Sequence, residues 1–249
     1  MNRVKYEFAR LSAVVRGALP TTSPIHSGTR VLMFHDLIAQ KSRRDVYSLP
    51  AETFSASIPA LAEWVATEHS QFVAFSGKPL PGVAITFDDG YQSTFKVASQ
   101  VLSELSIPFH VFVTKQFIES GNDHYLSTGD IKTLSTHPWV TFGIHGVTHT
   151  PFSQLAPSAL AGELRDSRKW LEDLVGRPVE TLSYPHGDFS RPVIDVVATE
   201  GFLAAACSAV GTFRLSQQRL TIPRIDVWSL DTTNVIVAKT RGDWDHILP

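Results

Sequence analysis

The chain has 249 residues, of which 43% are apolar and 18% are charged, so it is long enough to bury one sizeable core. The formal net charge is −2 with acidic and basic residues intermixed, which argues against nucleic acid or an anionic membrane as the main partner. Cys207 is the only cysteine, so an intrachain disulfide is excluded, and its apolar surroundings predict a buried structural thiol.

The amino-terminal segment, residues 1–28, is predicted to be an extension and linker. Its apolar run Leu11–Val15 is cut by Arg16 and is too short for the core of a secretory signal. Pro, Ser and Thr are frequent in residues 20–28, as in linkers. No other segment approaches the roughly 20 apolar residues of a transmembrane segment. We therefore expect a cytoplasmic protein with one domain over residues 29–249.

Seven short runs rich in Val, Ile, Phe and Thr recur along this domain, with helical patterns between them. The runs are Val31–His35, Val83–Asp88, Phe109–Thr114, Val140–His145, Thr181–Tyr184, Leu203–Ser208 and Thr221–Asp226. Strands that alternate with helices usually pair in parallel. The pattern predicts an α/β fold, an irregular (β/α)7 barrel similar to a TIM barrel, with its chemistry at the carboxyl ends of the strands.

Apolar residues three or four positions apart predict the helices between these strands. The first helix begins near Pro50 and buries a face formed by Phe54, Ile58, Leu61 and Trp64. Further helices are predicted over Phe95–Leu105, Leu160–Leu174 and Pro192–Thr199. Gly201 is expected to end the last of these, and Asp231 is expected to be the N-cap of a final helix.

Two adjacent carboxylates, Asp88 and Asp89, end the second predicted strand in the segment TFDDG, residues 86–90. The backbone bends at a strand end, so both side chains can reach one site, and Gly90 permits a sharp turn. A hydrolytic metal site needs one carboxylate as a ligand and a second that takes a proton from water. The alternative is structural, because Asp is also favoured at helix N-caps.

Two histidines, His145 and His149, follow the apolar run Val140–Ile144 in the segment HGVTH. Neutral imidazoles at this spacing can bind one divalent ion if the intervening residues form a single turn. With a carboxylate from a neighbouring strand they would form a set that suits zinc, iron, cobalt or manganese. Histidines without a metal, at the surface or in the core, are the alternative interpretation.

These segments resemble the motifs of the polysaccharide deacetylase family, which includes chitin, xylan and peptidoglycan deacetylases, and the resemblance covers residues 30–226. It implies that Asp88 is the catalytic base of a deacetylase-like catalytic domain. The implied ligands of one divalent ion, zinc first and cobalt, iron, manganese or nickel otherwise, are Asp89, His145 and His149. The family usually has Ser or Thr at Gly146, so a hydrogen bond that stabilises the loop is expected to be lost.

The segment SYPHG, residues 183–187, resembles a third family motif, in which a backbone N–H faces the reacting carbonyl. By position this N–H belongs to His186. The family often has an arginine that orients the base where this chain has Ser183, and we predict that Arg224 replaces it. The aromatic residues predicted to contact the substrate are Tyr91, Tyr184 and Trp228.

The segment LMFHD, residues 32–36, resembles a Leu-His-Asp motif that the family usually carries near its carboxyl terminus. A branch that acts on exopolysaccharides begins with such a strand, as if the barrel were circularly permuted. The resemblance implies that His35 is the general acid, placed opposite Asp88, and a core histidine is the alternative. Structural or surface roles are predicted for His110, His124, His137 and His246.

The predicted function is metal-dependent hydrolysis of an N-acetyl group on a carbohydrate, an amino sugar of a bacterial surface polysaccharide or its precursor, with release of acetate. One alternative is an allantoinase-like hydrolase of small cyclic amides or ureides, although the LMFHD strand favours a sugar. Another is a non-catalytic carbohydrate-binding relative, which would not need two aspartates beside two histidines. An iron oxygenase fits the ligand set, but such enzymes usually have antiparallel jelly rolls.

Overall fold

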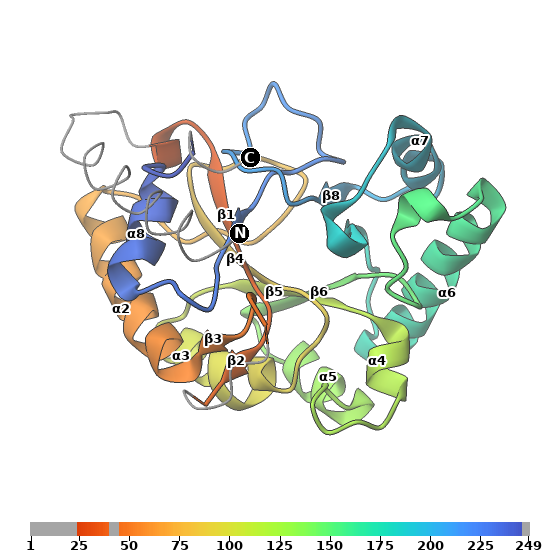
Figure 1. Cartoon of the computed structure of the whole chain (residues 1–249), viewed down its shortest axis with the longest axis horizontal. Helices are drawn as coiled ribbons and strands as arrows, with labels where there is room; N and C mark the ends of the chain where they lie inside the picture. Colours follow the sequence, from red (N-terminus) through yellow and green to blue (C-terminus); the bar gives the residue numbers. More distant parts are fainter. Residues whose placement is uncertain (1–23, 40–44, 246–249) are drawn as a thin grey trace.

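The structure is a computed structural model that describes residues 24–39 and 45–245, and its centre is one sheet of seven parallel strands (Figure 1). The strand order is β8-β7-β6-β5-β4-β1-β9. The strands are β1 (Thr29–Phe34), β4 (Gly82–Phe87), β5 (Phe109–Val113), β6 (Val140–Ile144), β7 (Thr181–Ser183), β8 (Ala204–Ala206) and β9 (Ile225–Asp226). Each of the seven predicted runs therefore contains a strand, although the last one is a strand only over Ile225–Asp226. A separate pair, β2 (Leu37–Ile38) and β3 (Leu49–Pro50), follows β1.

The sheet curls, and the predicted strand Thr221–Asp226 joins its two edges. The Ile222 N–H donates to the Ala205 carbonyl of β8 at 2.8 Å, and Ile225 then pairs with β1. Pro223 lies between them and lacks the N–H of a continuous ladder, which is consistent with the strand being broken in two. The predicted irregular (β/α)7 barrel is confirmed, with this segment as its seam.

Helices surround the curled sheet (Figure 1). The main ones are α2 (Ala51–Thr67), α3 (Ser99–Glu104), α4 (Lys115–Glu119), α5 (Thr128–Ser135), α6 (Pro157–Val175), α7 (Arg191–Thr199) and α8 (Thr233–Arg241). Short turns are η1 (Pro24–His26), η2 (Thr94–Ala98), η3 (Phe152–Gln154) and η4 (Pro185–Gly187). The helix predicted over Phe95–Leu105 begins as the π-helical turn η2 before α3. The face predicted for α2 is confirmed for Phe54, Ile58 and Leu61, which are buried, whereas Trp64 is only half-buried at its edge.

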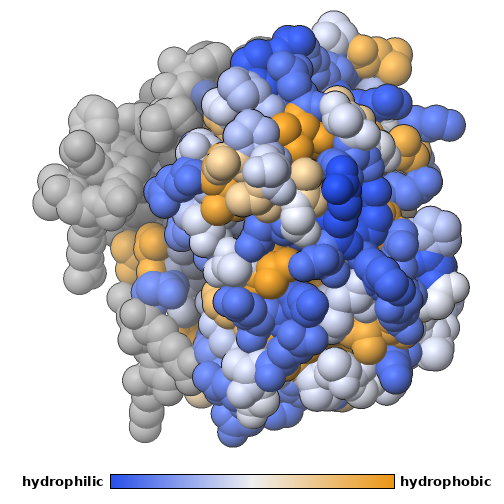
Figure 2. All heavy atoms as spheres, turned by 90° about the vertical axis from the view of Figure 1, so that its right-hand side faces the viewer, coloured by the Kyte–Doolittle hydropathy of each residue, from blue (hydrophilic) through white to orange (hydrophobic). Residues whose placement is uncertain are grey.

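Apolar side chains fill both sides of the strands, as parallel sheets covered by helices require. Every residue of β1 and β4 is buried, and the Phe34, Phe54 and Phe87 rings pack with centroids 5.2 to 5.9 Å apart. The Cys207 thiol is buried, as predicted. On the α6 and α7 side the surface is mainly hydrophilic, with hydrophobic residues in small separate groups (Figure 2). Within the described residues, no helix is both long and apolar enough to cross a membrane.

The prediction that Asp231 caps the last helix is wrong. The N-cap of α8 is Thr232, and the Asp231 carboxylate accepts hydrogen bonds from the Lys239 ammonium at 2.7 Å and from the Trp228 N–H at 2.8 Å. Both Lys239 and Asp231 side chains are fully buried. A buried ammonium needs a charged partner, and this requirement explains why the carboxylate turns inward.

The two ends of the domain meet at Arg30, a fully buried residue of β1. Its guanidinium donates two hydrogen bonds to Asp245, both at 2.7 Å, and others to the Lys239 and Thr240 carbonyls of α8. Ile25 of η1 is also buried in the main core. The domain boundary at residue 28 stays a prediction, because most of the proposed extension lies outside the described residues.

Replacing Arg30 by Met is expected to lower the free energy of unfolding by about 3 kcal/mol, because Asp245 and two carbonyls lose their donor. Urea denaturation of the full chain measures this. The matched control is Lys169→Met, which removes an exposed ion pair with Asp173 and should change stability little. Equal losses in the two variants would contradict a special role for the buried pair.

Candidate active site

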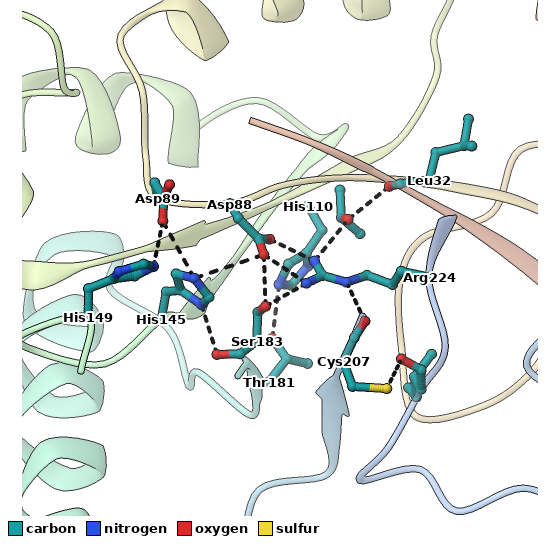
Figure 3. Close-up of polar contacts among 12 residues, drawn as sticks. Leu32, Asp88, Asp89, His110, His145, His149, Thr181, Ser183, Cys207 and Arg224 are labelled. Carbon is teal, nitrogen blue, oxygen red and sulfur yellow. Dashed lines mark hydrogen bonds and ion pairs between the residues drawn. The ribbon is translucent and has the colours of Figure 1, made fainter. Parts of the chain in front are cut away.

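Polar side chains gather at the carboxyl ends of the strands, as predicted (Figure 3). Asp88 and Asp89 follow β4, His145 and His149 follow β6, and Ser183 ends β7. They surround or adjoin a cavity of about 270 Å³. Its lining side chains are Met33, His35, Asp45, Tyr47, Asp88, Asp89, Tyr91, His145, His149, His186 and Ser208.

Asp89, His145 and His149 form a cluster whose potential ligand atoms lie within 4.8 Å of one another. Asp89 Oδ1 is 3.1 Å from His149 Nε2 and 3.5 Å from His145 Nε2. This oxygen is buried and accepts no well-oriented hydrogen bond in the described residues, so its charge is poorly satisfied by the protein alone. A divalent cation fits this donor set.

The surroundings of His145 prepare its ring for a metal. Its Nδ1–H donates to the Ser183 carbonyl at 2.8 Å, which orients the ring and leaves Nε2 with a free lone pair. Burial lowers the pKa of His145 to about 4, despite the opposing charges of Asp88 and Asp89, so the imidazole is neutral at pH 7. A neutral imidazole is the form that binds metal.

Three residues around the cavity have left-handed backbone conformations that are uncommon for non-glycine residues: Asp89 with φ 69°, His149 with φ 64° and His186 with φ 59°. Outside the site, the described residues with this feature are His69 and Ser106. Such conformations cost about 1 to 3 kcal/mol each and tend to occur where function fixes a side chain. Their concentration here supports a functional role for the cluster.

The carboxylate of Asp88 is held by a buried arginine. Arg224 donates to both carboxylate oxygens at 2.7 Å, in a bidentate pair within the barrel (Figure 3). Burial alone would raise the pKa of Asp88, but the positive charge of Arg224, with a smaller contribution from His145, shifts it well below its ordinary value. Asp88 is therefore ionised at neutral pH, and the structure brings it together with Arg224, as the sequence analysis expected.

Ser183 occupies the position where the motif usually has an arginine. Its hydroxyl donates to Asp88 Oδ2 at 2.9 Å and accepts from Arg224 Nη2 at 2.8 Å. Arg224 also donates to the Cys207 carbonyl at 3.1 Å, which fixes the other end of the guanidinium. The small serine leaves space for an arginine that approaches from the barrel seam.

The loop over residues 145–149 is fixed by Glu163 of α6, which the sequence analysis missed. One Glu163 oxygen accepts the N–H groups of Val147 at 2.7 Å and Thr148 at 3.1 Å. A Cβ at Gly146 would lie 3.2 Å from that oxygen, so the glycine makes room for it. Gly146 has no side chain that could donate the hydrogen bond of the usual Ser or Thr, and Glu163 stabilises the loop through its neighbours instead. The contact joins residues 15 and 16 positions apart, beyond the reach of local motif analysis.

His35 lines the cavity with Asp88, as predicted from the pairing of β1 with β4. The ring is half-buried, lies 4.6 Å from the Tyr47 ring, and its Nδ1 has no hydrogen-bond partner within the described residues. Asp226 is close enough to interact with the charge of His35 and was also missed. Burial raises the pKa of Asp226 against the opposing effects of Arg224 and His35.

The predicted aromatic contacts are only partly placed at the cavity. Tyr91 lines it, and so does Tyr47, which was not predicted. The prediction for Tyr184 is wrong, because the side chain is fully buried and its hydroxyl donates to the Leu220 carbonyl. Trp228 is not among the lining residues either, and the Lys239 ammonium lies 3.7 Å from its ring centroid. Periodicity could not show which side of the chain these rings would face.

The histidines predicted to have structural or surface roles lie apart from the cluster of Asp89, His145 and His149. The buried His110 ring is 2.7 Å from the Thr141 hydroxyl and 2.9 Å from the Thr181 hydroxyl, which confirms a structural role. His124 lies 3.4 Å from Asp36, and His137 is exposed. The prediction for His246 lies outside the described residues.

The fold and the cluster together define an α/β barrel with a carboxylate and histidine site at the carboxyl ends of its strands. The family model described as polysaccharide deacetylase matches residues 77–205, more than half of the chain. The chain belongs to this family. Membership assigns it to the carbohydrate deacetylases, a class of hydrolases.

Individual relatives agree with this assignment. YxkH of Bacillus subtilis (strain 168), which is named as a polysaccharide deacetylase by inference, is 24% identical over 222 residues. The match covers 87% of this chain and 75% of YxkH. The deacetylase PplD of Streptococcus pyogenes, solved with acetate, has TM-score 0.71 and 16% identity over 86% of this chain and 98% of its own. IcaB from Ammonifex degensii has TM-score 0.70 and 22% identity, and the match covers 86% of this chain and 97% of the IcaB chain. At these identities the two solved structures confirm the fold.

Glu163→Ala is expected to weaken zinc binding about 10- to 100-fold, because the loop that carries His149 loses two backbone contacts. Competition with a chromophoric chelator measures the affinity. The control on the same helix is Glu172→Ala, which removes a contact to the Val179 N–H far from the cluster and should leave zinc binding unchanged. Unchanged affinity in both variants would show that the loop holds its shape without Glu163.

Proposed function

We propose that this protein is a metal-dependent N-deacetylase that hydrolyses the N-acetyl group of an amino sugar in a bacterial surface polysaccharide or its precursor, releasing acetate. The observation that carries the proposal is the position of Asp88. It is an ionised carboxylate 4.0 Å from a potential metal ligand, His145, and is held by Arg224 instead of joining the ligand set. Mere carbohydrate binding would need no such arrangement.

Asp89, His145 and His149 would hold one divalent ion, with zinc as the first choice. When bound, the ion supplies positive charge that lowers the pKa of water and stabilises a negatively charged oxygen. The protein's own part is to keep the His145 imidazole neutral and the carboxylate of Asp89 deprotonated. The Ser183 carbonyl and Glu163 position this set from behind.

Asp88 accepts the proton of the attacking water in this proposal. Arg224 and Ser183 fix the carboxylate, which lines the cavity. The same two residues stabilise the ionised form, which lets Asp88 act over a wide pH range. The His186 N–H, in a strained turn at the cavity, is proposed to donate to the oxyanion of the tetrahedral intermediate.

His35 donates a proton to the departing amine in this mechanism, because an amide anion leaves very poorly. The ring lines the cavity with Asp88, and Tyr47 packs against it. Asp226 interacts electrostatically with the ring and is proposed to position it. Amide hydrolysis requires an acid and a base, and in this proposal they are His35 and Asp88, which follow two neighbouring strands and line one cavity.

A row of half-buried aromatic side chains borders the cavity. The row begins beside His149 and consists of Phe117, Tyr125, Tyr91 and His124, with successive ring centroids 4.7 to 5.2 Å apart. Phe117 lies 5.3 Å from the ring of His149. Tyr91 in this row also lines the catalytic cavity, so the row borders the cavity, and its rings can stack on a sugar or on a flat cyclic amide or ureide, which is the alternative substrate. The resemblance of the LMFHD strand favours the sugar.

The direct test is acetate release from a panel of N-acetylated glycans and glycan precursors by the zinc-loaded protein. Release should stop after chelation and return when metal is added. Hydrolysis of allantoin or hydantoin without release from any glycan would favour the cyclic amide alternative. Activity that is indifferent to chelation would contradict the metal-dependent mechanism.

Asp88→Asn is expected to abolish acetate release while zinc content stays at the wild-type level, because the variant loses the base and keeps all three ligands. The paired variant Asp89→Asn should lose zinc as well as activity. Metal analysis of the purified proteins separates the two effects. Zinc lost from Asp88→Asn but kept by Asp89→Asn would reverse the roles of the two aspartates.

His35→Ala is expected to lower kcat for an N-acetyl substrate by roughly a hundredfold to ten-thousandfold, the usual contribution of a positioned acid, with zinc affinity unchanged. An acetate ester with a good leaving group should lose much less, because its leaving group departs without protonation. The measurement is kcat on both substrates. An equal loss on amide and ester would indicate a binding or structural role for His35.

A further inference from the structure

A second cavity, of about 510 Å³, lies at the opposite end of the barrel from the catalytic residues. Thr141 and Thr181, at the beginnings of β6 and β7, line it, as does Leu203 directly before β8. The proposed catalytic groups follow the carboxyl ends of these parallel strands. The two cavities are therefore separate sites, and the volume is that of a typical small-molecule pocket.

The inner wall of this cavity is apolar and contains one buried polar ring. Phe75 and His110 are 6% and 2% exposed, and their ring centroids lie 5.2 Å apart. Burial lowers the pKa of His110 to about 3, so the ring is neutral, and both nitrogens contact threonine hydroxyls. Phe142 and the 41% exposed Leu203 extend the apolar wall outwards.

Positive side chains dominate the rim. Lys78, Arg177 and Arg219 line the cavity against a single acidic residue, Glu180. Arg177 donates to the Val140 carbonyl at 2.8 Å and is thereby oriented. The charged groups of Lys78 and Arg219 form no hydrogen bond or ion pair within the described part of the chain, so both are available to a ligand.

We propose that this cavity binds a small organic anion, a carboxylate or phosphate carried on an apolar body. The apolar body would pack on the wall formed by Phe75, Phe142 and Leu203. The anionic group would lie at the rim, where Lys78 and Arg219 are its partners. Both nitrogens of His110 contact threonine hydroxyls, so this wall offers no free polar group to a ligand and suits an apolar body.

Phenyl phosphate is the probe, because it joins a flat apolar ring to a dianion. Titration of the zinc-loaded full chain, followed by amide ¹H–¹⁵N spectra, should give saturable shifts at Gly77 in the cavity and none at Gly90 beside the catalytic carboxylates. The same shifts should persist after chelation of the metal. Phenol and inorganic phosphate, which each carry half of the ligand, should bind at least tenfold more weakly.

The double variant Lys78→Gln, Arg219→Gln should weaken phenyl phosphate binding at least tenfold while acetate release stays unchanged. Lys132→Gln, an exposed cation on α5, is the matched control and should bind normally. Shifts confined to Gly90, equal affinity in the double variant, or no saturation would overturn the proposal. Binding to phosphatidylcholine vesicles containing phosphatidic acid, without binding of phenyl phosphate, would also overturn it.

Discussion

The bidentate pair between Arg224 and Asp88 is the interaction on which the proposed site depends. Both side chains are almost fully buried, and an unpaired charge in the barrel would cost several kcal/mol. The pair is satisfied further by the Ser183 hydroxyl and the Cys207 carbonyl, so β4, β7 and β8 are fixed relative to one another by one guanidinium. The same contacts that make the buried charge tolerable also keep the proposed base ionised.

The position of Arg224 follows from how the barrel closes. Pro223 interrupts the last strand. Ile222, before it, pairs with Ala206 of β8, and Ile225, after it, pairs with Leu32 of β1. Arg224 lies in this step, where its N–H donates to the Ala209 carbonyl and its side chain enters the barrel. The seam and the orientation of the proposed base are therefore one structural feature. In an uninterrupted seventh strand, the backbone at this position would pair with a neighbouring strand in the regular hydrogen-bond pattern of the sheet.

Much of the fold and site could be predicted because the signals are local. Apolar runs located all seven strands, and parallel order placed Asp88, Asp89 and His145 at one end of the barrel. The missing motif arginine at Ser183 pointed to Arg224, and the structure places this residue against Asp88. Glu163 and Asp226 were missed because their contacts come from other elements. Tyr184 and Asp231 were misassigned for a related reason: the type of a residue does not reveal whether its side chain faces the cavity, the core or the solvent.

The two ends of the barrel differ in charge, and His110 lies between them. Carboxylates dominate the proposed catalytic cavity, whereas cations surround the cavity at the amino ends of the strands. The charges of Asp88 and Arg224 both act on the His110 ring, and burial keeps it neutral. An imidazolium here would compete with Arg224 for the proposed base. The hydroxyls of Thr141 and Thr181 satisfy the ring without adding charge, so the pair between Arg224 and Asp88 keeps its orientation.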